Sequence, residues 1–197
     1  EVPLTFRTAG TSLSGQAISD SVLVKLGHDW KGYMVEDGGR KIRLQPGVIG
    51  SQANSILKAY GRKIGPDPAS IDSAMIGGIA ANNASGMCCG TAQNSYQTLA
   101  SMRVILADGT VLDSNSADSL RAFCREKPVL LESLDQMRRE ILKNKELSEK
   151  IRTKYRIKNT TGYSLNSFIG YEDTVDILLH LMIGSEGTLG FISEITY

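Results

Sequence analysis

Cysteine is scarce in this sequence, and its arrangement argues against the two structural roles that cysteine most often has. There are three cysteines, Cys88, Cys89 and Cys124. Neighbouring cysteines seldom pair with each other, and an odd number leaves at least one thiol unpaired. No Cys-x-x-Cys repeat and no nearby histidine indicates a zinc site. We therefore expect reduced thiols and no metal, as in a cytoplasmic protein; a parent protein bound peripherally at the inner membrane is the alternative location.

Long apolar runs and an excess of either charge are also missing. No stretch approaches the roughly 18 apolar residues of a membrane span, and no signal peptide is recognisable. The net charge is +1, from 22 Lys and Arg against 21 Asp and Glu. The longest basic cluster, residues 138–145, is interrupted by Glu140, which is typical of a solvated helix face. The sequence therefore gives no electrostatic indication of a nucleic-acid partner.

Glycine is the residue present in excess. The chain has 20 glycines, about a tenth of its length, against ~7% in typical proteins. Many of them gather in four loops with Ser, Asn and Pro, at residues 10–15, 65–70, 77–86 and 184–190. Such loops let a ligand come close to the backbone, and folding alone seldom requires four of them. Together these four loops predict the walls of a binding site for a long, thin ligand.

The first of these loops follows a strand-like segment, an arrangement that often presents N–H groups to phosphate. Nevertheless, the loop matches neither of two familiar phosphate-binding motifs. Gly10 and Gly15 have the P-loop spacing, but Gln16 stands where that motif needs a lysine. Ser12 replaces the middle glycine of the dinucleotide fingerprint, and no helix is predicted to follow. A diphosphate bound by neutral donors remains the best interpretation, with a plain tight turn as the alternative.

Hydrophobic patterns predict a mixed α+β protein without regular βαβ alternation. Two hairpins are indicated by Asp-Gly-Gly and Ala-Asp-Gly turns between strand-like runs, and Leu-, Glu- and Lys-rich residues predict a helical insertion near 117–152. Ser51 is the expected N-cap of a helix that Gly61 ends. The remaining expected elements are strands at 4–7, 21–26 and 191–197 and helices at 75–81 and 173–183.

Five stretches, in order along the chain, resemble signatures of the FAD-linked oxidase family, which has the vanillyl-alcohol oxidase / p-cresol methylhydroxylase (PCMH) fold. They are residues 3–15, 45–48, 65–68, 76–86 and 184–190. The Lys-Asn-Thr-Thr-Gly-Tyr-Ser-Leu stretch at residues 158–165 is similar to the D-lactate / D-2-hydroxyacid dehydrogenase branch.

The resemblance implies an α+β, two-subdomain FAD-binding fold of the PCMH type. We expect residues 1–64 to form a first α+β subdomain and residues 65–197 a second, with FAD between them. Both ends of the chain lie inside strand-like segments. We therefore expect a longer parent protein with a further N-terminal segment and a C-terminal cap domain that holds the substrate.

The resemblance also implies the residues that bind FAD. The loop at residues 10–15 would hold the pyrophosphate, the segments near residues 66–91 the flavin or ribityl chain, and those near 186–192 the adenosine. The candidate cofactor-binding residues are Arg7, Gly10, Thr11, Ser12, Leu13, Ser14, Gly15, Pro66, Asp67, Gly77, Asn82, Ser85, Gly86, Thr91, Glu186, Gly190 and Ile192. The first loop lacks the histidine by which some relatives attach the cofactor, so we expect non-covalent FAD. His28 and His180 are not candidates.

The implied reaction is oxidation of a D-2-hydroxy acid such as D-lactate to the 2-oxo acid, by hydride transfer to flavin N5. No catalytic residue is assigned, because the family's base and substrate ligands come mainly from the cap. Two alternatives stay open: an FAD-dependent oxidase of another alcohol or sugar, and a non-catalytic nucleotide-binding domain. Gly-Met-Cys-Cys-Gly at residues 86–90 is weakly similar to fused relatives with iron–sulfur clusters. The electron acceptor is not indicated.

Overall fold

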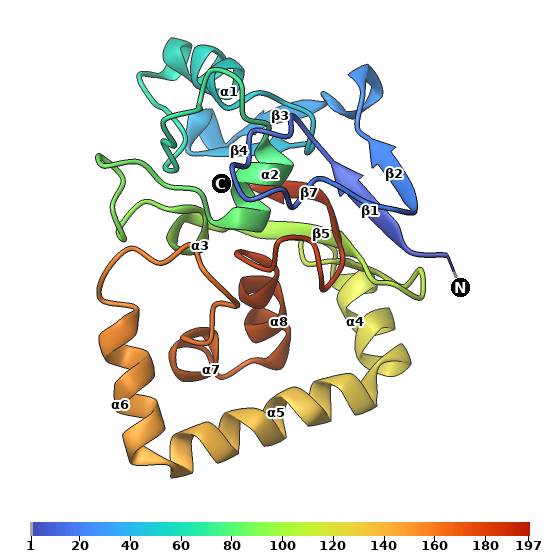
Figure 1. The fold of residues 1–197 in the computed structure, drawn as a ribbon, viewed down its shortest axis with the longest axis vertical. Helices are drawn as coiled ribbons and strands as arrows, with labels where there is room; N and C mark the ends of the chain where they lie inside the picture. Colours follow the sequence, from blue (N-terminus) through green and yellow to red (C-terminus); the bar gives the residue numbers. More distant parts are fainter. Residues whose placement is uncertain (1) are drawn as a thin grey trace.

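A computed structural model of the protein describes residues 2–197 and contains two sheets (Figure 1). The smaller pairs β1 (Leu4–Arg7) and β2 (Val22–Lys25) in parallel. The larger is antiparallel, in the order β3-β4-β7-β5-β6. Its strands are β3 (Tyr33–Glu36), β4 (Lys41–Leu44), β5 (Ser101–Ile105), β6 (Val111–Asp113) and β7 (Phe191–Thr196). The helices and strands together confirm the predicted α+β class.

The last strand lies at the centre of the larger sheet. Ile195 of β7 stands opposite Leu44 of β4 on one side and Met102 of β5 on the other. All three side chains are buried, because alternate residues of these strands face the core. Strands from both sides of residue 64 therefore share one sheet. The division into subdomains at that residue stays a prediction.

Both predicted hairpins are present, and their turn residues explain them. Between β3 and β4 a single 3₁₀ turn, η2 (Asp37–Gly39), has positive φ angles of 51°, 61° and 83°. Two glycines and an aspartate tolerate this left-handed backbone. Between β5 and β6 the N–H of Leu106 donates to the carbonyl of Thr110, and Gly109 has φ +84°.

Besides the 3₁₀ turns η1 (His28–Trp30) and η3 (Lys58–Tyr60), residues 2–197 contain eight α-helices. They are α1 (Gly50–Leu57), α2 (Ile76–Asn82), α3 (Ser95–Thr98), α4 (Ala117–Glu126), α5 (Pro128–Lys143), α6 (Lys145–Lys154), α7 (Ser167–Gly170) and α8 (Thr174–Met182). The prediction that Ser51 is the N-cap of α1 is wrong, because the helix begins at Gly50. Ile49 is the cap residue, and its N–H donates to the side chain of Gln52.

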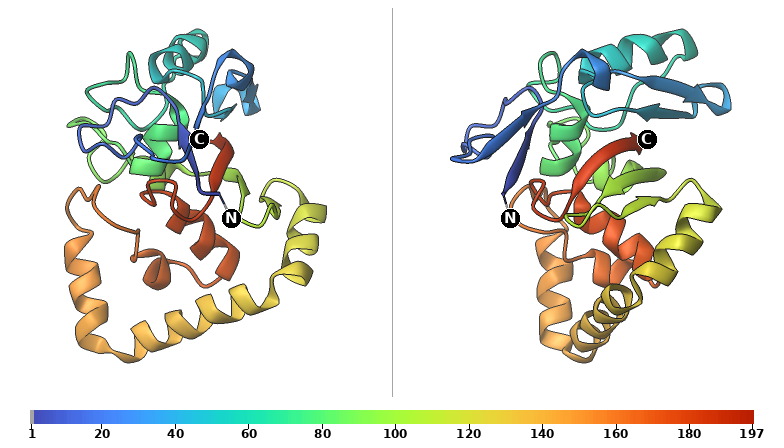
Figure 2. Two further views of the ribbon diagram at one scale, coloured as in Figure 1. Left: turned by 45° about the vertical axis from the view of Figure 1, so that its right-hand side comes forward. Right: turned by 90° about the vertical axis from the view of Figure 1, so that its right-hand side faces the viewer.

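The predicted helical insertion consists of α4, α5 and α6, which form an arch around α7 and α8 (Figure 1). Figure 2 places this arch at one end of the molecule and β1–β4 at the other. Phe123, Leu134 and Ile151 are the buried anchors of the three helices. Met137 and Leu142 follow the same helical period but are exposed, so the apolar face of α5 is only partly covered.

Helix α8 is buried around its whole circumference after the first turn, where Asp176 is exposed. All residues of this helix from Ile177 to Met182 are buried, including His180. A helix that is apolar all round belongs in the interior of a domain. Among the described residues, no helix combines the length and apolar character needed to cross a bilayer.

Candidate flavin site

The loop at residues 10–15 follows β1 directly and turns through two left-handed glycines. Gly10 has φ +70° and Gly15 has φ +74°. The guanidinium group of Arg7 lies over the first of them, since a Cβ on Gly10 would stand 2.6 Å from its Nε. Residues 11–14, with three hydroxyl side chains, are exposed. The loop therefore presents backbone and hydroxyl groups on an open surface.

This loop is seated against helix α2 through Thr8. A Cβ on Gly77 would lie 2.6 Å from the Cβ of Pro46 and 3.1 Å from the Cγ2 of Thr8. A Cβ on Gly78 would lie 2.8 Å from the hydroxyl oxygen of Thr8. The two glycines at the start of α2 are thus needed because they let the segments around Thr8 and Pro46 approach this helix closely.

The opposite end of α2 is tied to the loop at residues 184–190. The side-chain amide of Asn82 donates to the carboxylate of Glu186. The backbone N–H of Glu186 donates to the carbonyl of Ala81 at 2.9 Å, and that of Gly184 to Ala80 at 3.2 Å. Glu186 itself has φ +55°, a strained conformation for a residue other than glycine. Two predicted site residues 104 positions apart are therefore in direct contact.

Asp67 connects the loop at residues 65–70 to the segment that follows α2. Its Oδ1 accepts the N–H of Gly86 at 3.0 Å and the N–H of Cys89 at 3.1 Å. Burial alone would raise the pKa of this carboxyl, but the contacts with Cys89 and Gly86 hold it below its ordinary value. A Cβ on Gly86 would lie only 2.0 Å from the backbone oxygen of Asp67, so only glycine fits there.

Ser85 has the feature that most directly indicates a ligand. Its hydroxyl oxygen is buried and has no hydrogen-bond partner within residues 2–197. A buried hydroxyl without a partner is costly unless something else satisfies it. The backbone oxygen of the same residue accepts a hydrogen bond from the ammonium group of Lys158.

Lys158 is the site residue that sequence reasoning missed. It opens the stretch at residues 158–165 that indicated the hydroxyacid branch, but nothing in its local pattern shows that it reaches Ser85, 73 positions away. The lysine brings a positive charge to the loop that was predicted to lie near the flavin.

The two adjacent thiols differ in exposure. Cys88 is exposed, whereas Cys89 is buried and its Sγ lies 3.7 Å from the carbonyl oxygens of Gly86 and Gly90. Burial and the neighbouring Asp67 carboxylate raise the pKa of the Cys89 thiol. The protonated thiol is a poor nucleophile, which favours a structural role for this cysteine.

For the other four predicted cofactor contacts, the structure gives burial or packing but no hydrogen bond within the candidate site. Pro66 and Ile192 are buried, and Thr91 is half-buried. Gly190 passes close to β5, since a Cβ there would lie 2.9 Å from the carbonyl oxygen of Ile105. The side chain of Ile192 belongs to the hydrophobic core, so its contact with adenosine stays a prediction.

His180 packs among aromatic rings on α8. Its ring stacks on Tyr171 with centroids 4.0 Å apart and meets the edge of Tyr96 at 4.8 Å. Nδ1 lies 2.7 Å from the carbonyl oxygen of Asp176, to which it donates. Burial lowers the pKa of the imidazole, so the neutral form is favoured. The residues 2–197 contain no cluster of three or more His, Cys, Asp or Glu side chains that could hold a metal.

Comparison with known protein families shows which family this chain belongs to. A family model described as "FAD binding domain" matches residues 1–115, more than half of the chain. The chain belongs to this FAD binding domain family. The match includes every signature stretch up to residue 86 and ends before the helical insertion.

Curated relatives of this FAD binding domain extend over the rest of the chain. A D-2-hydroxyglutarate dehydrogenase of Haemophilus influenzae is 26% identical over 98% of the chain and 19% of its own length. The D-lactate dehydrogenase of Archaeoglobus fulgidus is 25% identical over 99% of the chain and 32% of its length. The glycolate oxidase subunit GlcD of Escherichia coli is 32% identical over 66% of the chain and 28% of its length. The chain thus spans about a fifth to a third of these relatives.

A solved structure of an alkyldihydroxyacetonephosphate synthase has the same fold. It superposes with a TM-score of 0.58 at 16% identity, covering 98% of this chain and 26% of that one. The PCMH-type fold of the FAD binding domain is therefore confirmed.

Proposed function

We propose that this chain is the FAD-binding part of an oxidoreductase that oxidises a D-2-hydroxy acid to the 2-oxo acid. The proposal rests on the observation that two of the glycine-rich segments converge on α2. Thr8 contacts the start of this helix, and Glu186 is hydrogen-bonded at its end. Family membership supports the cofactor, and the names of the relatives support the substrate class.

The residues of this chain would act by binding and orientation. The exposed loop at residues 10–15 would present N–H groups and hydroxyls to the pyrophosphate. Asp67 would fix the segment at Gly86 and Cys89 so that the backbone beside the flavin keeps its shape. The unpartnered hydroxyl of Ser85 is the donor that a carbonyl or hydroxyl of the cofactor would satisfy. FAD would bind through such contacts without a covalent link.

Bound FAD would supply the hydride acceptor, and the protein would supply position and electrostatics. Lys158 places a positive charge beside the loop of Ser85, where it would favour a cofactor that gains negative charge. We propose that the base and the residues that bind the substrate lie in a cap domain elsewhere in the longer protein, as the resemblance implies.

Anaerobic flavin reduction tests the proposal in the longer protein that contains this chain. The FAD-loaded protein is mixed with D-lactate, D-2-hydroxyglutarate, glycolate or an alcohol without a carboxylate, and the visible flavin absorbance is followed. We expect bleaching by D-2-hydroxy acids, with the L-enantiomers as matched controls. Reduction by simple alcohols or sugars, or equal rates for both enantiomers, would contradict the substrate assignment and favour an oxidase of another alcohol.

A further inference from the structure

Positive charge is concentrated in one part of this nearly neutral chain. Residues 38–66 contain six basic residues and no aspartate or glutamate, whereas the whole chain has 22 basic and 21 acidic residues. The six are Arg40, Lys41, Arg43, Lys58, Arg62 and Lys63. The segment begins in the β3–β4 turn and ends inside the loop at residues 65–70, one residue before Asp67. It is therefore a local electropositive region rather than part of a general basic surface.

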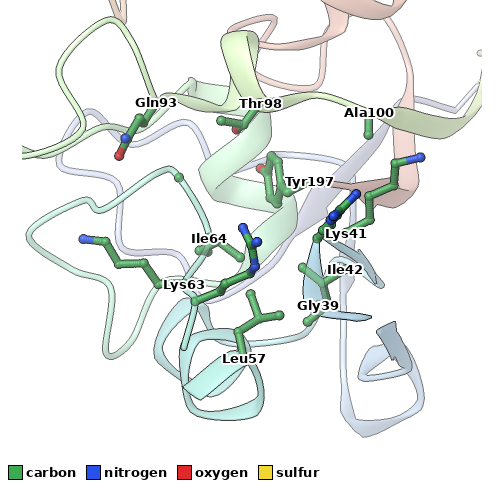
Figure 3. Close-up of a pocket in the computed structure, with 13 residues that line it drawn as sticks. Gly39, Lys41, Ile42, Leu57, Lys63, Ile64, Gln93, Thr98, Ala100 and Tyr197 are labelled. Carbon is green, nitrogen blue, oxygen red and sulfur yellow. The ribbon is translucent and has the colours of Figure 1, made fainter. Parts of the chain in front are cut away.

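Four of these residues line one cleft, whose volume is about 600 Å³ (Figure 3). Its floor is apolar and is formed by buried side chains that belong to the core. These floor residues are Ile42, Leu57, Ile64 and Tyr197. No carboxylate is among the residues that line the cleft.

Most of the positive charge on the rim is not neutralised within the described part of the chain. Lys41 lies 3.5 Å from the carboxylate of Asp37, and both side chains are about half exposed. Arg40, Arg62 and Lys63 are exposed and form no ion pair with any of residues 2–197. Three unpaired cations thus surround an apolar floor.

The polar groups inside the cleft favour an extended occupant over a small anion. The hydroxyl of Thr98 donates to the carbonyl of Asn94 at 2.8 Å, and that of Tyr197 is 2.8 Å from the hydroxyl of Ser95. Both hydroxyls are therefore already bonded. A small anion would meet only exposed, flexible cations, each worth about 0–1 kcal/mol. A peptide segment can place carboxylates on the rim and apolar side chains on the floor at the same time.

We propose that this cleft is a docking site for an acidic segment of a partner protein, one in which carboxylates alternate with apolar or aromatic side chains. Charge complementarity supplies the steering, and burial of the apolar side chains against the floor supplies the affinity. The proposal goes beyond the flavin site. Of the residues in the cleft, only Gly65 belongs to the loop of Asp67.

Fluorescence anisotropy tests the proposal on the 197-residue chain. The probe is a short fluorescein-labelled peptide in which Glu alternates with Leu and Phe. One variant reverses the rim charges, Arg40→Glu, Arg62→Glu and Lys63→Glu. A matched control, Lys143→Glu, Lys145→Glu and Lys154→Glu, makes the same charge change on the exposed helical arch. A third variant, Ala100→Trp, fills the cleft at an exposed position without changing charge. Circular dichroism establishes that each variant is folded.

We expect the rim variant to weaken peptide binding at least tenfold, the matched control less than about threefold, and Ala100→Trp severalfold. Equal losses in the rim variant and the matched control would overturn the proposal, because they would reflect net charge alone. A peptide of Glu alternating with Gly that binds as tightly would also overturn it, because the floor would contribute nothing. Citrate or ATP that competes as well as the unlabelled peptide would assign the cleft to small anions instead.

Discussion

Gly86→Ala is the substitution for which the structure predicts the sharpest effect. The new Cβ would lie 2.0 Å from the backbone oxygen of Asp67 and 2.6 Å from its Oδ1. An ordinary contact begins near 3.4 Å, so the two segments must move apart by roughly 1.4 Å. The nearest atom belongs to the backbone, and a change of rotamer cannot relieve the clash.

The movement would separate the Asp67 carboxylate from the two N–H groups that it accepts, at 3.0 and 3.1 Å. Overpacking typically costs about 1–3 kcal/mol, and a hydrogen bond to a charged group contributes about 1.5–3 kcal/mol. Because the loop is only half buried, part of that cost is relieved by local rearrangement. We expect the free energy of unfolding to fall by about 2 kcal/mol and FAD to bind at least tenfold more weakly.

Urea unfolding and a flavin fluorescence titration measure the two effects, and Gly90→Ala is the matched control. Gly90 has φ +51°, but a Cβ there would meet nothing within 4 Å. The control should therefore lose about 1 kcal/mol of stability from backbone strain and keep its FAD affinity within about threefold. If both variants lose stability and FAD affinity equally, the reasoning from the Asp67 contact is refuted.

Three further predictions follow from single side chains. Asp67→Ala leaves two N–H groups without their acceptor and should lower stability by about 2–3 kcal/mol in urea unfolding, whereas Asp67→Asn keeps an acceptor oxygen and should lose less. Lys158→Met removes the donor to Ser85 and should weaken FAD binding severalfold in the fluorescence titration; Lys158→Arg should recover part of that loss, and equal affinities for both variants would argue against a role for the charge. Burial lowers the folded pKa of His180, so stability is complete above the unfolded pKa of about 6.5 and falls as pH decreases from there toward the folded value. His180→Gln should flatten that part of the pH–stability curve, and an unchanged slope would contradict the assignment.

Local features of the fold were predictable because their causes are local. Asp37 and the two glycines after it specify a left-handed turn wherever they occur between strands, and the hairpin is found there. Helical periodicity likewise located the arch of α4–α6. The same signal could not show that Met137 is exposed, because the exposure depends on which neighbours cover the helix.

The contacts within the site were less predictable, because they join residues far apart in the sequence. Motifs indicated Asn82 and Glu186 separately, but only the folded chain brings them together. Lys158 was not a candidate at all, since a lone lysine after a helix carries no local signature of its contact with Ser85. The central place of β7 is a similar case, because sheet order depends on long-range pairing.

A binding titration of the folded 197-residue chain with FAD, FMN and ADP tests the central claim most directly. Flavin fluorescence follows FAD and FMN, and ADP is measured by competition. We expect FAD to bind more tightly than either part-molecule, because in the proposed function the loops at residues 10–15 and 184–190 would contact different portions of one long ligand. A folded chain that binds ADP as tightly as FAD, or gives no signal with FAD, would contradict it.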